Sequence, residues 1–452
     1  MTDPRQRSDK GLIAAQAPRI ISDAVCTYCS CMCDDIELTV NCRQITHARN
    51  ACKLGKAWFT KPRPETLPAC RIRGKPASIE DGLSRAAELL SAAKYPLVYG
   101  LTGTTCEAQR VAVAIADSLG AVLDTATSLS HAPSIMAFQN VGKVTSTLGE
   151  ICNRGDLVVF WGANPVDTHP RVTSKYTLDP RGMFLPRGRR DRTCVVIDIQ
   201  PTATSQAADV FLQIRPESDF EAIWVLRSLA RDIELDAEQV LEQTGVTLAA
   251  WKDLMRRMKQ ARYGVFLFGM GLMRTRGQHS NCEALFSLTR DLNDYTRFIC
   301  RSVRARGNVT GADKVVSWRT GYPFAVDLAR AYPRYSPGEY TASDTLSRNE
   351  PDAALILAAD PLTTLTPAAA KRLQAIPYVA IGAEENATLE QAEVAFRTST
   401  LGIHAPGTVY RMDEVPLSLR PAFASDYPCD VHILESLERR ISTHAHDQQQ
   451  TS

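Results

Sequence analysis

Apolar and polar residues group into short blocks along most of the chain, and the blocks predict strands and helices in turn. Continuous apolar runs at 96–100 and 156–162 end in glycine and have the length of buried strands. Between them, 78–93 has apolar residues at helical spacing. Further strands are predicted at 121–124, 194–199, 263–269, 353–359 and 376–382, and further helices at 106–120, 220–230, 281–292 and 366–373.

Strands that are apolar throughout, alternating with helices, are typical of parallel sheets covered on both faces. The predicted fold class is therefore α/β, with two doubly wound, mostly parallel sheets. From changes in residue composition along the chain, we predict four parts. They are a small Cys-rich N-terminal cap at 20–70, a first α/β domain at 71–216, a second at 217–405, and a C-terminal extension at 406–452.

Composition narrows the class of function. The chain has 452 residues, enough for two to four domains at about 150 residues each. Its formal net charge of +2 argues against a nucleic-acid partner, which usually requires a strongly basic domain. No stretch approaches the roughly 18 apolar residues that indicate a membrane span. The charged N-terminus lacks an apolar secretion signal, so we expect a cytoplasmic protein.

Cysteine is the residue type whose distribution stands out. Of 13 cysteines, five fall between Cys26 and Cys42. Cys26, Cys29 and Cys33, followed by Cys52, have spacings that wrap a metal cluster, because a short loop brings three thiolates to one centre and a distant fourth completes the shell. Cys31 leaves the choice of ligands partly open. Zinc is a rival metal, since it also accepts four thiolates, and a reduced loop without metal is the plainer alternative.

Several blocks carry a family resemblance. They include Cys26-Thr-Tyr-Cys-Ser-Cys-Met-Cys, Ala51-Cys-Lys-Leu-Gly, Asn308-Val-Thr-Gly-Ala and Gly321-Tyr-Pro-Phe-Ala-Val-Asp, the last two within a motif-rich region at 305–345. Together they resemble the B subunits of formylmethanofuran dehydrogenase, a family of the molybdopterin oxidoreductase superfamily. Within it, the chain most resembles the B subunit of the bacterial formyltransferase/hydrolase complex.

The resemblance implies a fold, cofactors and partners. It implies an iron–sulfur-type cap, with a possible [4Fe-4S] cluster on the four cysteines, followed by two doubly wound domains. It also implies that the pterin-binding β-barrel is a separate subunit. The expected partners are therefore subunits A, C and D of one complex, together with a methanofuran-type formyl carrier.

One position departs from the redox-active members that the chain resembles. In them, a cysteine directly before a histidine ligates tungsten or molybdenum, whereas this chain has Ser130 before His131. A serine hydroxyl is a harder donor than a thiolate and is protonated at neutral pH. We therefore expect no tungsto- or molybdopterin and regard Ser130 and His131 as remnants of a catalytic site.

The sequence leaves three functions open. The first is a non-redox scaffold subunit of a formyltransferase/hydrolase complex, active in the oxidation of formaldehyde to formate. The second is a redox-active tungsten or molybdenum subunit, with Ser130 as an unusual ligand. The third is an oxidoreductase that resembles formate dehydrogenase, which the missing barrel disfavours.

A further block follows a predicted strand end, where α/β sheets bind ligands. It comprises Trp161-Gly-Ala-Asn-Pro and, shortly after, His169-Pro-Arg. By the resemblance, Asn164, His169 and Arg171 are candidate cofactor-binding residues. An ordinary turn set by Gly162 and Pro165 is the simpler interpretation.

Overall fold

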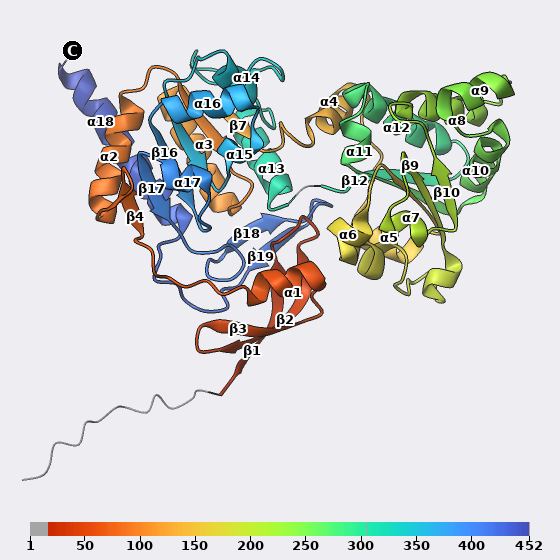
Figure 1. The fold of residues 1–452 in the computed structure, drawn as a ribbon, viewed down its shortest axis with the longest axis horizontal. Coiled ribbons are helices and arrows are strands. Elements are labelled where there is room, and N and C mark those ends of the chain that lie inside the picture. Colours follow the sequence, from red (N-terminus) through yellow and green to blue (C-terminus); the bar gives the residue numbers. More distant parts are fainter. Residues whose placement is uncertain (1–16, 305, 452) are drawn as a thin grey trace, which may run out of the picture.

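The computed structural model describes residues 17–304 and 306–451. The chain begins with a cap, a three-stranded antiparallel sheet followed by one helix (Figure 1). Its elements are β1 (Arg19–Cys26), β2 (Cys33–Asn41), β3 (Gln44–Arg49) and α1 (Lys53–Thr60). The strands alternate between buried and exposed positions, as expected for a sheet with one covered face.

The larger α/β domain has a nine-stranded sheet in the order β14-β13-β7-β6-β15-β16-β17-β4-β5. Its five central strands, from β7 to β17, are parallel, and the flanking strands pair antiparallel. In sequence order the strands are β4 (Cys70–Ile72), β5 (Lys75–Pro76), β6 (Pro96–Gly100), β7 (Val122–Thr125), β13 (Val326–Asp327), β14 (Arg334–Tyr335), β15 (Ala353–Leu357), β16 (Tyr378–Gly382) and β17 (Val394–Arg397).

Helices cover both faces of this sheet. The face that carries Leu355 and Phe396 packs against α2 (Ile79–Ser91), α3 (Cys106–Leu119), α13 (Val309–Thr320) and α18 (Asp430–Thr451). The other face packs against α14 (Ala342–Ser347), α15 (Pro361–Thr364), α16 (Pro367–Ala375) and α17 (Ala387–Gln391). Covered on both sides, the central strands bury every apolar residue, which explains their unbroken apolar runs.

The smaller α/β domain has a five-stranded, wholly parallel sheet in the order β10-β9-β8-β11-β12. The strands are β8 (Leu157–Trp161), β9 (Thr193–Asp198), β10 (Val210–Gln213), β11 (Tyr263–Phe268) and β12 (Arg297–Ser302). The helices are α5 (Leu148–Arg154), α6 (Pro165–Thr168), π-helix η1 (Val172–Thr177), 3-10 helix η2 (Gly188–Asp191), α7 (Ala203–Gln206), α8 (Asp219–Ala230), α9 (Ala237–Thr244), α10 (Leu248–Gln260), α11 (Met270–Met273) and α12 (Gln278–Leu292). Helix α4 (Ala132–Val141) connects the two domains and packs on α12.

The expected division of the α/β region at residue 216 is wrong. All strands between 157 and 302 pair with one another, so the smaller domain is inserted into the larger one, to which the chain returns at α13. The 406–452 segment is no separate extension, because α18 packs on α2 and α3. The cap also ends before Cys70, where β4 joins the large sheet. Strand partners are set by tertiary packing, which local patterns do not reveal.

The predicted fold class is confirmed: a Cys-rich cap precedes two doubly wound, mostly parallel sheet domains. None of the sheets formed by residues 17–304 and 306–451 closes into a barrel. Among the same residues, no helix has the length and apolar character required to span a bilayer.

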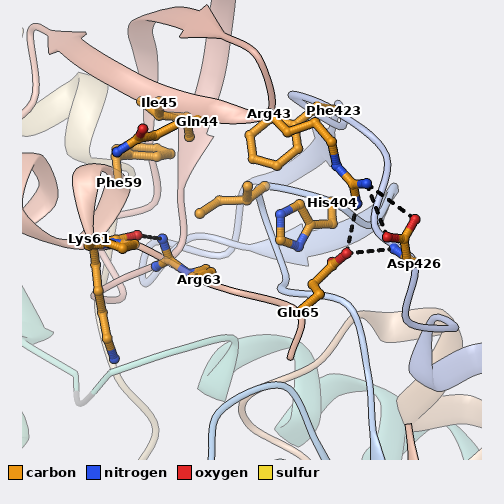
Figure 2. A pocket seen from close by; sticks show the side chains of 12 residues that line it. Arg43, Gln44, Ile45, Phe59, Lys61, Arg63, Glu65, His404, Phe423 and Asp426 are labelled. Atoms are coloured by element: carbon orange, nitrogen blue, oxygen red, sulfur yellow. Dashed lines mark hydrogen bonds and ion pairs between the residues drawn. The ribbon is translucent and has the colours of Figure 1, made fainter. Parts of the chain in front are cut away.

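The cap is attached to a C-terminal segment at 400–427 (Figure 2). Arg43 of the cap forms ion pairs with Glu65, at 2.7 Å, and with Asp426, at 3.0 Å. Glu65 also accepts hydrogen bonds from the Ser425 hydroxyl and the Asp426 backbone N–H. These contacts fix the cap to residues more than 350 positions away in sequence.

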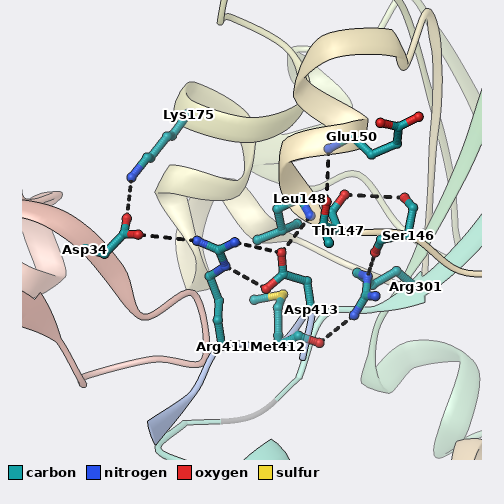
Figure 3. A network of polar contacts seen from close by, with 10 residues as sticks. All are labelled: Asp34, Ser146, Thr147, Leu148, Glu150, Lys175, Arg301, Arg411, Met412 and Asp413. Atoms are coloured by element: carbon teal, nitrogen blue, oxygen red, sulfur yellow. Dashed lines mark hydrogen bonds and ion pairs between the residues drawn. The ribbon is translucent and has the colours of Figure 1, made fainter. Parts of the chain in front are cut away.

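A hairpin of β18 (Gly407–Tyr410) and β19 (Pro416–Leu419) lies between the cap and the larger domain (Figure 1). Its turn carries a buried ion pair, in which Arg411 donates two hydrogen bonds to Asp413, at 2.6 and 2.9 Å (Figure 3). Asp413 also accepts the backbone N–H of Leu148, the first residue of α5, at 2.7 Å. Arg411 reaches Asp34 of the cap at 3.6 Å. We call this group the hairpin clamp, because it joins the cap, the hairpin and the smaller domain.

The hairpin clamp predicts a large stability loss for Asp413→Ala. The change would leave the buried Arg411 guanidinium with only the more distant and more exposed carboxylate of Asp34, and the first N–H of α5 without its acceptor. Removing one partner of a buried pair costs about 3–5 kcal/mol. Asp426→Ala, which breaks an exposed and solvent-screened pair, should change the stability far less. Urea denaturation of both variants measures the difference, and equal losses would contradict the role of the clamp.

Candidate functional site

The cap places its cysteines around one small cavity. Cys26 ends β1 and lies directly opposite Cys33, the first residue of β2. Cys29 lies in the connecting turn, where its carbonyl accepts the Met32 N–H at 3.1 Å. Cys52 is the N-cap of α1, and its sulfur accepts the Gly55 N–H at 3.4 Å. The cavity is lined by these four cysteines and by Cys31, Tyr28, Ile36, Ala51, Gly55, His169, Pro170 and Arg171.

The thiols are close enough to influence one another. Burial raises the pKa of Cys26 well above its ordinary value, and the nearby thiols of Cys33, Cys29 and Cys52 raise it further. Burial also raises the pKa of Cys33 to about 12, against the lowering effect of Arg171 and Lys175. Without a bound cation these sites would therefore be protonated thiols, since several thiolates in one buried space require a positive charge.

The cysteine thiols line a small cavity and do not converge on one point. Among residues 17–304 and 306–451, no three His, Cys, Asp or Glu side chains converge as a single metal ion would require. Instead, the thiols surround a space. Cys31, two residues beyond Cys29, lines the same space and is a fifth thiol within it.

A short π-helix brings basic residues onto the cysteine cavity. Just before η1, Arg171 pairs with Asp35 of β2. Within η1, Lys175 pairs with Asp34 at 3.0 Å and with Asp35 at 2.9 Å. The wider π-turn, often found at functional sites, thus presents two cations beside Cys33.

The three cofactor candidates separate in the structure. His169 and Arg171 line the cysteine cavity. Asn164 does not line it, and instead braces the end of β8, where its side-chain oxygen accepts the Thr204 N–H at 3.2 Å and hydroxyl at 2.7 Å. Burial lowers the pKa of His169 to about 4, so its ring is neutral at pH 7.

Ser130 and His131 lie in the loop between β7 and α4. The Ser130 side chain is half-buried, and its hydroxyl donates to the Ala126 carbonyl at 3.1 Å. His131 is completely buried, and burial, reinforced by the nearby Arg304, lowers its pKa well below the ordinary value. The histidine therefore remains a neutral ring inside the protein.

Sequence reasoning missed Arg304 and Asp313, two buried charges beside His131. They form an ion pair at 2.5 Å, and the Thr127 hydroxyl donates to Asp313 at 2.7 Å. The Arg304 carbonyl accepts the Ser30 hydroxyl at 2.8 Å, which links it to the cysteine loop. Both residues flank the Asn308-Val-Thr-Gly-Ala block, so that block was the sequence feature that could have pointed to them.

Arg304 and Asp313 also line a cavity of about 500 Å³ near this loop. Lys143 and Lys314 line the cavity too, and Glu414 pairs with Lys314 at 3.1 Å. Phe138 and Trp318, at its rim, are 51% and 64% exposed. The cavity thus combines a basic interior with an apolar rim, a combination suited to contact with another molecule.

The chain is similar to known proteins over most of its length. No protein-family model matches the chain. The chain is 38% identical over 409 residues to the B subunit of the tungsten-containing formylmethanofuran dehydrogenase 2 of Methanocaldococcus jannaschii, covering 89% of this chain and 93% of that protein. It is 26% identical over 342 residues to the B subunit of the formyltransferase/hydrolase complex Fhc of Methylorubrum extorquens, covering 76% and 88%.

A solved structure shares the fold. It is the crystal structure of the formyltransferase/hydrolase complex from Methylorubrum extorquens in complex with methylofuran. The match has a TM-score of 0.69 and 23% identity, and covers 83% of this chain and 99% of that chain. At this identity the match concerns the fold alone.

The buried His169 predicts a specific acid sensitivity. Its folded-state pKa of about 4 lies below the roughly 6.5 of an unfolded histidine. Stability from the neutral ring is therefore complete above about pH 6.5 and is lost as pH falls towards 4, by about 3 kcal/mol in all. His169→Gln should remove that part of the pH dependence, whereas His47→Gln, at an exposed ring, should not. Denaturation curves between pH 7 and 4 test this, and an unchanged slope in His169→Gln would refute it.

Proposed function

Because the chain belongs to the family of formylmethanofuran dehydrogenase B subunits, we propose that it is the B subunit of a complex that transfers and hydrolyses a formyl group. In this proposal the chain is a non-redox scaffold, and formyl transfer and hydrolysis take place on other subunits. The complex acts in the oxidation of formaldehyde to formate in the cytoplasm.

The observation that carries the non-redox part is Ser130. The resemblance implies a metal-ligating cysteine at this position in redox-active members. Here the hydroxyl already donates to the Ala126 carbonyl. To bind tungsten or molybdenum, it would have to lose this hydrogen bond and a proton of high pKa. The neighbouring His131 is buried and neutral, so it adds no charge that would favour such a step.

We propose that the cap holds an iron–sulfur cluster. Cys26, Cys29, Cys33 and Cys52 surround a space, as the four thiolates of a [4Fe-4S] cluster do. Arg171 and Lys175 supply positive charge beside them, which offsets the negative charge of a thiolate cluster. When bound, such a cluster supplies electron transfer, and in a non-redox subunit its contribution would be to the folding of the cap.

The partners that we propose are subunits A, C and D and a methanofuran-type carrier. Support comes from the similar subunit of Methylorubrum extorquens, whose structure was solved within a complex that contains methylofuran. The exposed Phe138 and Trp318, at the rim of the 500 Å³ cavity, give this chain an apolar face suited to a neighbouring subunit.

A redox-active tungsten or molybdenum subunit is the second candidate. It is favoured by the higher identity to the tungsten-containing relative, 38% against 26% for the relative from the formyltransferase/hydrolase complex. The buried Arg304–Asp313 pair beside His131 also retains the charged surroundings of a reaction site. A function similar to that of formate dehydrogenase is a third alternative, which the family membership disfavours.

Substituting Ser130 separates the first two candidates. Ser130→Ala, in the co-expressed complex, should leave formyl transfer and formate release nearly unchanged, because the hydroxyl is engaged with a nearby carbonyl. His131→Gln should have little catalytic effect beyond its cost in packing. Steady-state assays of the assembled complex provide the measurement. A loss of several orders of magnitude in Ser130→Ala, with the complex intact, would establish the redox alternative.

Replacing Cys29 tests the cluster. Cys29→Ala in anaerobically purified protein should lower the iron content, weaken visible absorption near 400 nm and lower the thermal stability of the cap. Cys42→Ala, at an exposed cysteine outside the cavity, is the matched control and should change none of these. If the wild-type protein contains neither iron nor zinc, the cysteines are not a metal site.

A further inference from the structure

A second polar hollow lies on the opposite end of α1 from the cysteines, between the cap and the 400–427 segment (Figure 2). It has two adjoining parts, of about 220 and 250 Å³. Both are lined by Lys61, Pro62, Arg63, Glu65 and His404. Either part is smaller than the roughly 300–1,000 Å³ typical of sites for drug-sized ligands, so the ligand would be small.

One wall of the hollow is apolar. Ile45, Phe59 and Ile403 are each less than 5% exposed, and Phe423 packs against the edge of the His404 ring at 4.8 Å between ring centres. Figure 2 shows His404 beside Phe423, and Arg63 on the segment that follows α1 with its guanidinium directed to the Lys61 carbonyl. A ligand between them would contact hydrocarbon on one side and polar groups on the other.

The Arg63 guanidinium has no carboxylate partner among the described residues. It donates to the backbone carbonyls of Lys61, at 3.0 Å, and Trp58, at 2.7 Å, and its carbon lies 5.1 Å from the centre of the Trp58 ring. Burial lowers its pKa, with only a small opposing effect of Glu384. A partly buried cation without a counterion is costly, and an anion beside it would offset that cost.

His404 offers the hollow a neutral donor. Its Nδ1 accepts the Thr400 backbone N–H at 3.1 Å, and burial lowers its pKa to about 4. A neutral imidazole that accepts at Nδ1 carries its proton on Nε2. The described residues provide no hydrogen-bond partner for that Nε2–H, so it can donate to a ligand oxygen.

Each acidic residue that lines the hollow is engaged with a cation, although Glu65 and Asp426 share one, and Glu385 pairs with Arg397 at 3.1 Å. Glu65 pairs with Arg43 and accepts hydrogen bonds from Ser425 and Asp426. Asp426 pairs with the same Arg43. At the mouth, the exposed Lys61 lies 3.5 Å from Glu384. Among the residues that line the hollow, Arg63 is therefore the cation without a carboxylate partner.

We propose that this hollow binds a small carboxylate on an apolar body, with Arg63 and His404 as donors to its two oxygens. The planar guanidinium suits a carboxylate, and the apolar wall suits a short hydrocarbon or aromatic group. The same chemistry has two possible sources, a free carboxylic acid or a carboxylate of a partner chain. The site is separate from Ser130 and from the cysteine cavity, and the inference does not depend on the proposed function.

The test measures binding of butyrate and benzoate by saturation-transfer NMR, with sulfate as the competing anion. Both the purified full-length chain and its co-expressed complex are titrated. Arg63→Gln should weaken binding about tenfold or more, since a hydrogen bond to a charged group is lost. His404→Phe, which keeps the ring contact with Phe423 and removes the donor, should weaken it several-fold.

The control variant is Lys56→Gln, which removes the same charge from an exposed position on α1 outside the hollow. It should bind butyrate as the wild type does. If a free acid is the ligand, both the chain and the complex bind butyrate. If a partner chain supplies the carboxylate, the isolated chain binds butyrate and the complex does not. In that case Arg63→Gln weakens assembly about tenfold.

Two results would overturn the proposal. One is the absence of carboxylate binding in the wild-type chain together with normal assembly of Arg63→Gln. The other is equal affinity for sulfate and butyrate, or an equal loss of butyrate affinity in Lys56→Gln and Arg63→Gln. Either outcome would show that binding depends only on general positive charge.

Discussion

The buried ion pair between Arg411 and Asp413 is the contact on which the relative placement of the parts depends. It sits in the turn of a hairpin, and its groups reach the cap through Asp34 and the smaller domain through the N–H of Leu148. Arg301 of β12 donates to the Met412 carbonyl at 2.6 Å, so the same turn is also held from the sheet (Figure 3). A buried ion pair restricts the positions of the parts that it joins, since moving one partner away leaves the other as an unpaired buried charge.

This placement brings together two sites that are distant in sequence. Once the cap is held against the smaller domain, Arg171 and Lys175 lie beside Cys33. The Ser30 hydroxyl then meets the Arg304 carbonyl, next to the buried His131. A continuous set of buried polar contacts thus runs from the cysteine loop to the loop of Ser130. This set of contacts is present although the side chain at position 130 is a serine hydroxyl.

Local sequence patterns predicted many of the helices and strands and part of the site. The run at 353–357 was predictable because a strand covered on both faces must be apolar throughout. By contrast, β12 was missed, since Arg297 and Arg301 interrupt its apolar run. The insertion of one domain into the other was also missed, because a βαβ unit has the same pattern in either sheet.

The site shows the same limits. Cysteine spacing gathered the four thiols correctly around one cavity, because β1 and β2 form a tight local unit. His169 and Arg171 proved to line the same cavity, whereas Asn164 braces a strand end. Arg304 and Asp313 were missed although they flank the Asn308-Val-Thr-Gly-Ala block, since the importance of a single charged residue depends on its burial and its partner.

We propose that this chain works in a complex that transfers and hydrolyses a formyl group, and that it does not hold tungsten or molybdenum. Elemental analysis of the native complex, purified anaerobically, gives the amount of each metal per copy of this chain. We expect iron in the amount of a four-iron cluster and no tungsten or molybdenum above background. One tungsten or molybdenum per chain would contradict it.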